Sequence, residues 1–157
     1  MKNKLIKRGI IVVAIGLAAG VLYAVYLFNM PHRDVQASNA DFELEAGELV
    51  SEYLANPEAA NEKYLQEEGE SKILIISGTI ASIDTDMNNL HVVLLKKPTD
   101  KAGVSCTFMT STDEKAAQLK VGQTISIKGV IRAGAGYDAD LGLYENVILE
   151  KSDIVSK

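Results

Sequence analysis

The chain of 157 residues has room for one compact domain and an appendage, which excludes two full domains. All 21 acidic residues lie at or beyond Asp34, against 11 of the 16 basic ones, and residues 34–70 hold 11 of the acids but only one base, Lys63. Residues 71–157 hold equal numbers of acidic and basic side chains, which argues against non-specific nucleic-acid binding because such binding needs a basic excess.

The first predicted element is a membrane-spanning helix over residues 9–28. These residues carry no charged or strongly polar side chain, and at about 1.5 Å per residue they are long enough to cross a hydrocarbon core of about 30 Å. A cleaved signal peptide is the alternative, but its apolar core usually runs only about 7–15 residues before a small-x-small cleavage site. The sequence Val35-Gln36-Ala37 fits such a site poorly, so we expect an uncleaved signal anchor.

Basic side chains lie mainly on one side of this helix. Residues 1–8 form a basic flank, whereas Arg33 alone follows the helix. By the positive-inside rule the N-terminus is then cytoplasmic and the C-terminal domain extracytoplasmic, in a single-pass protein that contacts membrane lipid through its helix.

Small residues recur every fourth position in the helix, at Gly16, Gly20 and Ala24. Such a ridge allows close packing of a second helix and is compatible with a homodimer. Because glycine and alanine are common in membrane helices, a ridge without a partner is the other interpretation.

After a linker over residues 29–41, which we expect to be largely unstructured, an acidic helical segment is predicted over residues 42–70. Its apolar residues recur at helical spacing, at Leu44, Leu49, Val50, Tyr53 and Leu54. Asn56 followed by Pro57 is typical of an N-cap and first helical position, so a second helix restarts there and runs through Tyr64. The acids are expected on the solvated faces.

From residue 73 the apolar period changes to two, with the β-branched enrichment of strands. Five strands are predicted, at residues 73–83, 90–95, 104–109, 124–132 and about 143–150. A Ser-x-x-Glu capping box at residues 111–114 predicts a helix over residues 113–120 that ends at Gly122. Gly78 indicates a bulge or bend in the longest strand. The fold class is all-β with accessory helices: a five-stranded, antiparallel, OB-like barrel, β-β-β-α-β-β, over residues 71–157.

Several stretches of the domain also match a known pattern. They are residues 48–50 with Asn56, the helix at residues 59–65, residues 76–80 and 119–129, and the Gly-Val-Ser-Cys-Thr-Phe run at residues 103–108, which is the most specific. Over roughly residues 41–154 the chain thus resembles the tRNA_anti-like family of OB-fold domains, which often occur in bacterial membrane-anchored proteins. The junction at residues 30–34 resembles that of such anchored proteins. The resemblance implies the fold and only loosely an activity.

Residues for catalysis or metal binding are sparse. With only His32 and His91, the sequence offers no histidine pair for a metal and little for a Ser-His-Asp arrangement. The single cysteine, Cys106, excludes an intramolecular disulfide and is expected to be a core thiol. Residues 138–142 lack the later ligands of a calcium loop, and residues 134–136 lack the third glycine of a dinucleotide motif. We therefore expect no catalytic residue, no metal and no cofactor.

The remaining candidate site is the usual OB ligand surface, formed by the second and third strands with the loops between strands one and two and strands four and five. Alternation in the fourth strand places Lys128 and Arg132 on its outer face, where they could meet an anion. Phe108, Tyr137 and Tyr144 could stack on bases or sugars. A solvated face over a packed core is the alternative.

Three functions remain open. The leading expectation is a non-catalytic, membrane-tethered module that engages an envelope protein or a small ligand. The alternative is an OB domain that binds an oligonucleotide or oligosaccharide, although the scattered lysines do not favour nucleic acid as partner. A hydrolase whose site forms only on folding is the third.

Overall fold

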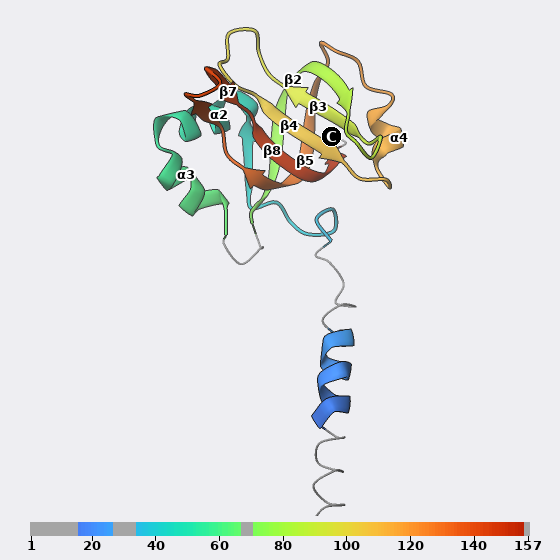
Figure 1. Ribbon diagram of the computed structural model, residues 1–157. Helices are drawn as coiled ribbons and strands as arrows, with labels where there is room; N and C mark the ends of the chain where they lie inside the picture. Colours follow the sequence, from blue (N-terminus) through green and yellow to red (C-terminus); the bar gives the residue numbers. More distant parts are fainter. Residues whose placement is uncertain (1–15, 27–33, 67–70, 156–157) are drawn as a thin grey trace, which may run out of the picture. The chain divides into compact units, whose positions relative to one another are not determined.

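The computed structural model describes residues 16–26, 34–66 and 71–155 of the chain (Figure 1). The chain divides into two units, residues 1–34 and 35–157. In the first unit residues 16–26 form an exposed helix that includes Gly16, Gly20 and Ala24; the other residues of the predicted span and the basic flank lie outside the described residues. Within the described residues, no helix has the length and apolarity needed to cross a membrane.

The second unit opens with a short strand that the sequence analysis missed. This strand, β1 (Phe42–Glu45), pairs in parallel with the first half of β2, with Phe42 opposite Leu74. Two helices follow, α2 (Ala46–Ala55) and α3 (Pro57–Tyr64), as predicted. The carboxamide oxygen of Asn56 accepts a hydrogen bond from the main-chain nitrogen of Ala59 at 3.2 Å, which confirms the predicted N-cap.

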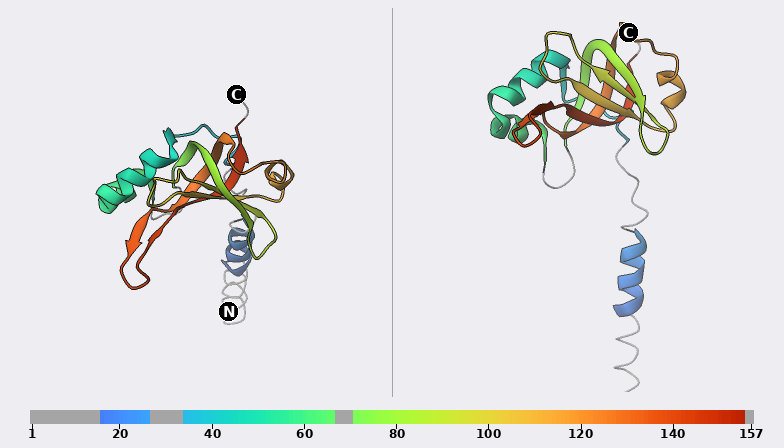
Figure 2. Two further views of the ribbon diagram at one scale, coloured as in Figure 1. Left: turned by 90° about the horizontal axis from the view of Figure 1, so that it is seen from above. Right: turned by 45° about the horizontal axis from the view of Figure 1, so that its top comes forward.

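Five strands form the barrel: β2 (Ile73–Thr85), β3 (His91–Leu95), β4 (Val104–Phe108), β5 (Thr124–Ala133) and β8 (Val147–Ile154). They neighbour one another in the order β2-β3-β4-β8-β5, and the ring closes because β2 also pairs with β5 (Figures 1 and 2). The long strand β2 pairs with β5 up to Thr79 and with β3 from Ile80 onward. An OB-like barrel with a helix between its third and fourth strands is therefore confirmed.

The expectation that all five strands are antiparallel is wrong. The pair β4–β8 is parallel, with Val104 opposite Val147 and Cys106 opposite Leu149. The physical reason is parity: strand directions cannot alternate all the way around a closed ring of five, so at least one neighbouring pair must run the same way. The parallel β1–β2 pair adds a second exception outside the ring.

Gly78 lies where β2 changes partners. A Cβ atom there would lie 3.1 Å from Leu95 Cβ and 3.2 Å from Ala46 Cβ, tighter than most contacts, so the small residue allows α2 and β3 to approach β2. The register irregularity itself falls further along, between Ile80 and Ser82.

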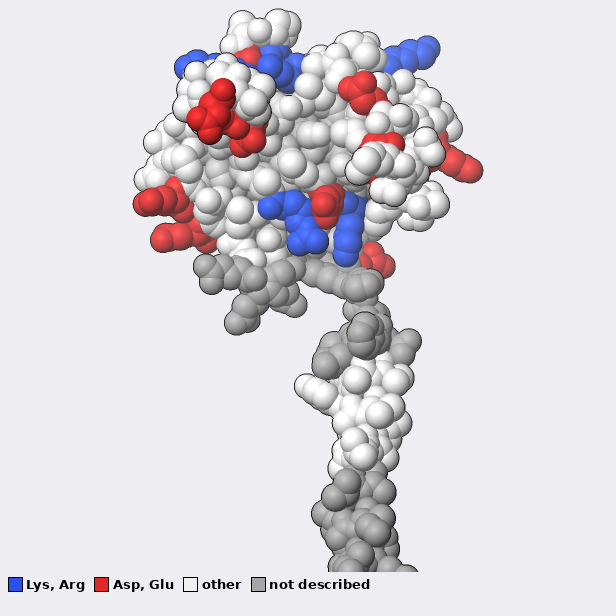
Figure 3. Space-filling view, in the orientation of Figure 1, with Lys and Arg blue, Asp and Glu red and all other residues white. Residues whose placement is uncertain are grey.

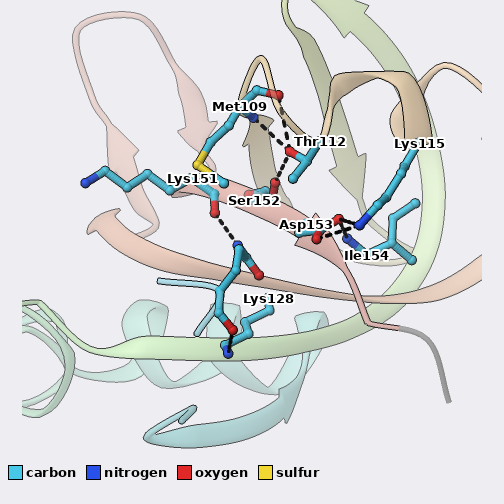
Figure 4. A network of polar contacts seen from close by, with 9 residues as sticks. Met109, Thr112, Lys115, Lys128, Lys151, Ser152, Asp153 and Ile154 are labelled. Atoms are coloured by element: carbon cyan, nitrogen blue, oxygen red, sulfur yellow. Dashed lines mark hydrogen bonds and ion pairs between the residues drawn. The ribbon is translucent and has the colours of Figure 1, made fainter. Parts of the chain in front are cut away.

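The predicted helix over residues 113–120 is shorter than expected. It is observed as α4 (Asp113–Ala116), and Thr112 takes the N-cap position without a side-chain capping bond. The Thr112 hydroxyl instead donates to the main-chain carbonyl of Ser152 at 2.7 Å and accepts from Met109 N at 3.1 Å (Figure 4). The capping box is thus replaced by a contact that joins the loop to β8.

The predicted last strand is two elements. Leu143–Glu145 forms β7, which pairs with β6 (Gly136–Asp138) in a separate hairpin, and β8 begins only at Val147. Between them, the Asn146 side-chain oxygen accepts a hydrogen bond from Gly103 N at 2.8 Å. This bond lies where the chain passes from the hairpin into the barrel.

The barrel core is continuous with the helices. Its fully buried large side chains include Ile76, Ile80, Leu95, Phe108, Ile127, Ile131 and Leu149, together with Tyr53 of α2 and Tyr64 of α3. Tyr53 packs on the chain just before the β6–β7 hairpin, where a Cβ atom on Gly134 would lie 2.0 Å from the tyrosine ring. Only glycine fits this contact, which fixes the base of the hairpin against α2.

Candidate ligand-binding face

Strands β3 and β4 present an uncharged outer face. Their buried residues, Val93, Leu95, Val104, Cys106 and Phe108, alternate with partly exposed ones. The partly exposed residues pair across the strands, Val92 with Thr107 and Leu94 with Ser105. On the neighbouring strand Ile148 lies opposite Ser105 and is 40% exposed. We call these five residues, Val92, Leu94, Ser105, Thr107 and Ile148, the β3–β4 face.

The β6–β7 hairpin, which leads directly into β8 next to β4, carries two tyrosines. The rings of Tyr137 and Tyr144 lie 4.9 Å apart between centroids at an angle of 52°, and Tyr137 is 58% exposed. The ammonium of Lys101, in the loop before β4, lies 5.3 Å from the Tyr144 ring centroid. The hairpin projects from the barrel in Figure 2, and the chain runs from it into β8, where Val147 lies opposite Val104 at the start of β4.

The structure does not bring the sequence-predicted site residues together. Phe108 is only 1% exposed in the core, so it cannot stack on a ligand. Arg132 is held in an ion pair, with its Nε atom 2.8 Å from Glu150 Oε2. Of the five residues predicted, only Tyr137 and Tyr144 contact each other.

Lys128 is occupied by residues 35–41, which we call the strap. Its ammonium donates to the main-chain carbonyls of Gln36, at 2.9 Å, and Ser38. The Gln36 side chain donates to the carbonyl of Lys151 at 2.6 Å, and Lys151 holds a positive φ of 53° (Figure 4). Val35 is buried against Ile73 and Val130. The segment expected to be unstructured thus contains turns without helix or strand, yet it is fixed to the barrel.

The charged groups on the barrel are scattered, and several of them form ion pairs. Lys115 lies 2.8 Å from Asp153, and Lys72 lies 3.5 Å from Asp41. Figure 3 shows small separate groups of basic and acidic side chains and no continuous basic stripe on the side in view. Two hydrogen bonds with His91 lower the pKa of the Asp113 carboxyl. The bond from the His91 main-chain nitrogen has the larger effect, and the bond with the His91 ring has the smaller one.

Among residues 16–26, 34–66 and 71–155, the side chains considered for catalysis are Cys106 and His91. Burial raises the pKa of the Cys106 thiol well above its usual range, so this side chain stays protonated and is a poor nucleophile. His91 binds Asp113, with 2.9 Å between Nδ1 and Oδ1, and thereby ties β3 to α4. Within the described residues, no group of three or more His, Cys, Asp or Glu side chains could hold a metal ion.

Sequence reasoning named the surface of its second and third strands, which are β3 and β4, but it chose none of their outward-facing residues, and it missed the strap. The alternation in residues 90–95 and 104–108 was sufficient to find the face. The strap had no local signal, because its contacts join residues far apart in the sequence, 92 positions between Gln36 and Lys128 and 115 between Gln36 and Lys151.

A family model described as tRNA_anti-like matches residues 1–140. Among solved structures, a lipoprotein of Klebsiella pneumoniae subsp. pneumoniae MGH 78578, whose name provisionally assigns it nucleic-acid binding, matches with a TM-score of 0.53 and 16% identity over 81% of this chain and 100% of that one. At that identity the likeness is one of fold.

Two further structures match smaller parts of the chain. The Stn1-ten1 complex of S. pombe has a TM-score of 0.36 at 18% identity, covering 54% of this chain and 59% of that one. RecG bound to a three-way DNA junction has a TM-score of 0.33 at 16% identity, covering 54% of this chain and 11% of that one. The comparison with curated proteins gives no match.

Proposed function

The chain belongs to the tRNA_anti-like family, and from that premise we propose that its barrel is a non-catalytic OB module that binds an oligonucleotide or an oligosaccharide on the β3–β4 face. The observation that carries the proposal is the Tyr137–Tyr144 pair at one end of this face. Stacking of a base on an aromatic side chain contributes about 1–3 kcal/mol, and an apolar sugar face can pack on the same rings.

The comparisons support this oligomer-binding function better than the leading expectation of an envelope-protein or small-ligand module. The matched family is one of OB folds, and the lipoprotein of similar fold carries nucleic-acid binding in its name. Oligomer binding therefore now ranks ahead of the envelope-protein or small-ligand module, which the sequence analysis had placed first because the domain has no basic excess.

Charge still limits how a nucleic acid would be held. The β3–β4 face contains no charged residue, and Lys101 is the one cation placed beside the tyrosine pair by the contacts described above. Single-strand binding loses affinity with salt at a logarithmic slope of about −0.7 per phosphate neutralised. A slope shallower than about −1 is then expected, with stacking as the main contribution.

We test the function by fluorescence anisotropy on the full-length chain in nanodiscs, with a labelled single-stranded oligonucleotide and a labelled neutral oligosaccharide. Binding of one of them should weaken about tenfold in Tyr137→Ala, since loss of one stacking contact of about 1–3 kcal/mol has that size. Val121→Ala, an exposed apolar truncation on another part of the barrel, is the matched control. Absence of binding to both probes, or equal affinity in Tyr137→Ala, would contradict the function.

A protein partner or small ligand is the second candidate, because apolar side chains extend the tyrosine pair. Leu141 and Leu143 of the hairpin are exposed, as is Ile148 beside them in sequence on β8. Exposed apolar residues that gather on one projection are typical of protein-binding surfaces.

The tether is part of the proposal. Residues 9–28 are proposed to anchor the chain in the membrane, with the N-terminus in the cytoplasm and the barrel outside. Dimerisation through Gly16, Gly20 and Ala24 would be its helix–helix contact. Protease added to spheroplasts should digest the barrel and spare an N-terminal tag, whereas digestion only after lysis would refute this orientation.

A further inference from the structure

The outer face of β2 and β5 is a second surface, built on different strands from the β3–β4 face. At one end the strap covers it, with Val35 on Ile73 and Val130 and with Gln36 and Ser38 on Lys128. The same face continues beyond Lys128 along both strands, since Ile75 pairs with Lys128, Ser77 with Ser126 and Thr79 with Thr124. One half of the face is therefore covered by the chain itself.

The other half is an open groove lined by two pairs of hydroxyls. Ser77 Oγ lies 2.8 Å from Ser126 Oγ, and Thr79 Oγ1 lies 3.2 Å from Thr124 Oγ1. Three adjoining clefts, of about 300, 210 and 480 Å³, follow this surface. The first two share Ser77 and Thr124, and the last two share Thr79 and two lysines, so the clefts form one groove.

The groove carries no net charge at its middle. Its two cations, Lys96 and Lys97, face two carboxylates, Glu45 and Asp100. Lys97 Nζ lies 3.3 Å from Glu45 Oε2, and Asp100 accepts a hydrogen bond from the main-chain nitrogen of Lys97. Such a balanced wall neither attracts a polyanion nor favours a strongly basic ligand.

The far end of the groove combines apolar residues with the two lysines. Its apolar residues are Ile80, Ala81, Pro98 and Val121, and Val121 is 63% exposed. Removing such a side chain from water on binding is favourable, so this end fits an apolar side chain of an occupant.

The strap indicates which kind of occupant the face accepts. On the covered half the barrel binds a polypeptide through its main-chain carbonyls, a side-chain amide and one buried apolar side chain, Val35. The open half offers comparable polar groups, the hydroxyls of Ser77, Ser126, Thr79 and Thr124. A hydroxyl can either donate to a carbonyl or accept from an N–H, and an extended main chain presents both groups. The apolar end at Val121 then corresponds to the Val35 site.

We propose that the open half of the β2–β5 face binds an extended, uncharged segment of a partner protein, with one apolar side chain seated beside Val121. The segment would lie next to the strap and add to it along the same face. This site does not rest on the oligomer-binding function, which uses the β3–β4 face.

The test selects short random peptides on phage against the full-length chain in nanodiscs. Selected peptides are expected to have little net charge and an apolar residue in common, and their affinity should fall at least about tenfold in Val121→Glu and in Ala81→Arg. Both positions are exposed, so the melting temperature should not change. Tyr137→Ala, at the other face, should bind the peptides as the wild type does.

Three results would overturn the site: no selected peptide, peptides that bind Val121→Glu and Ala81→Arg unchanged, or peptides lost in Tyr137→Ala. Maltohexaose and a thymidine oligonucleotide are tested on the same variants. Dependence of either of them on Val121 or Ala81, without such dependence for any peptide, would assign the groove to that ligand instead and refute the proposal.

Discussion

The two outer faces of the barrel differ in what reaches them from elsewhere in the chain. The β3–β4 face is formed by neighbouring strands, carries no charge and is bordered by a hairpin with two tyrosines. The β2–β5 face carries hydroxyls and Lys128, and a segment from before the first strand covers half of it. Alternation along a strand therefore tells which residues point outward, whereas distant segments decide which of them a ligand can reach.

The largest expected effect concerns the base of the hairpin that borders the β3–β4 face. In Gly134→Ala the new Cβ would lie 2.0 Å from the Tyr53 ring, so the hairpin or α2 must move. We expect the free energy of unfolding to fall by about 2–3 kcal/mol, as for an overpacked core site. Chemical denaturation measures it.

Gly136→Ala is the matched control, because a Cβ there meets only Glu145 Oε2 at 3.8 Å. Its stability should change by less than about 0.5 kcal/mol. Equal stabilities of the two variants would mean that the hairpin base is not fixed by Tyr53.

The next effect concerns the covered half of the β2–β5 face. Lys128→Met keeps most of the aliphatic stem but removes the donor to the carbonyls of Gln36 and Ser38. We expect the free energy of unfolding to fall by about 1.5–3 kcal/mol, the range for hydrogen bonds to charged groups. Hydrogen exchange should become faster in residues 35–41 and stay slow in β3 and β4.

Lys120→Met removes an exposed lysine and should leave both stability and exchange unchanged. If exchange in the strap is equally fast in the wild type and in Lys128→Met, the strap is not held by this ammonium.

A smaller change, this time a gain in stability, is expected on substitution of Tyr53, whose ring packs against Gly134 at the base of the hairpin. Its hydroxyl is buried without a hydrogen-bond partner, so Tyr53→Phe removes an unsatisfied polar group. The variant should be more stable by about 1 kcal/mol at neutral pH. A destabilised Tyr53→Phe would show that the hydroxyl has a partner in solution.

The pH dependence gives the same residue a second test. Burial, with smaller contributions from Tyr64 and Glu52, raises the pKa of Tyr53 to about 12, from 10.0 for the free side chain. Because the folded state favours the neutral phenol, this contribution to stability is complete below pH 10 and is lost as the pH rises toward 12. Stability should fall less steeply across this range in Tyr53→Phe than in the wild type.

The smallest effect is expected at Arg132, which the sequence suggested as an anion-binding residue. Its exposed ion pair with Glu150 contributes at most about 1 kcal/mol, so Arg132→Gln should change stability little. Oligonucleotide affinity should also stay within about twofold of wild type. A severalfold loss of affinity would return Arg132 to the ligand site and move the site away from the β3–β4 face.

Local patterns predicted most of the fold. Asn56 with Pro57 specified the helix restart because both the cap and the fixed proline φ act within one turn. The long alternating run from Ile73 identified β2 because one of its faces is buried. The break at Asn146 was missed, since it depends on a bond to Gly103, 43 residues away.

The site was less predictable because accessibility is a property of the assembled barrel. The alternation that placed Phe108 with Val104 and Cys106 already pointed it to the core, yet its aromatic ring suggested stacking. Lys128 does point outward, as its strand predicts, but the strap occupies its ammonium. The tyrosine pair could be predicted from the sequence, because Tyr137 and Tyr144 flank a short segment that contains Gly142 and is typical of a turn.

Methyl NMR tests most directly whether an oligomer binds on the β3–β4 face. The full-length chain in nanodiscs, with labelled valine and leucine, is titrated with the oligonucleotide and with the oligosaccharide. We expect the methyl signals of Val92, Leu94 and Leu143 to shift with one of these probes while the signal of Val121 stays in place. Shifts confined to Val121, or no shift with either oligomer, would contradict it.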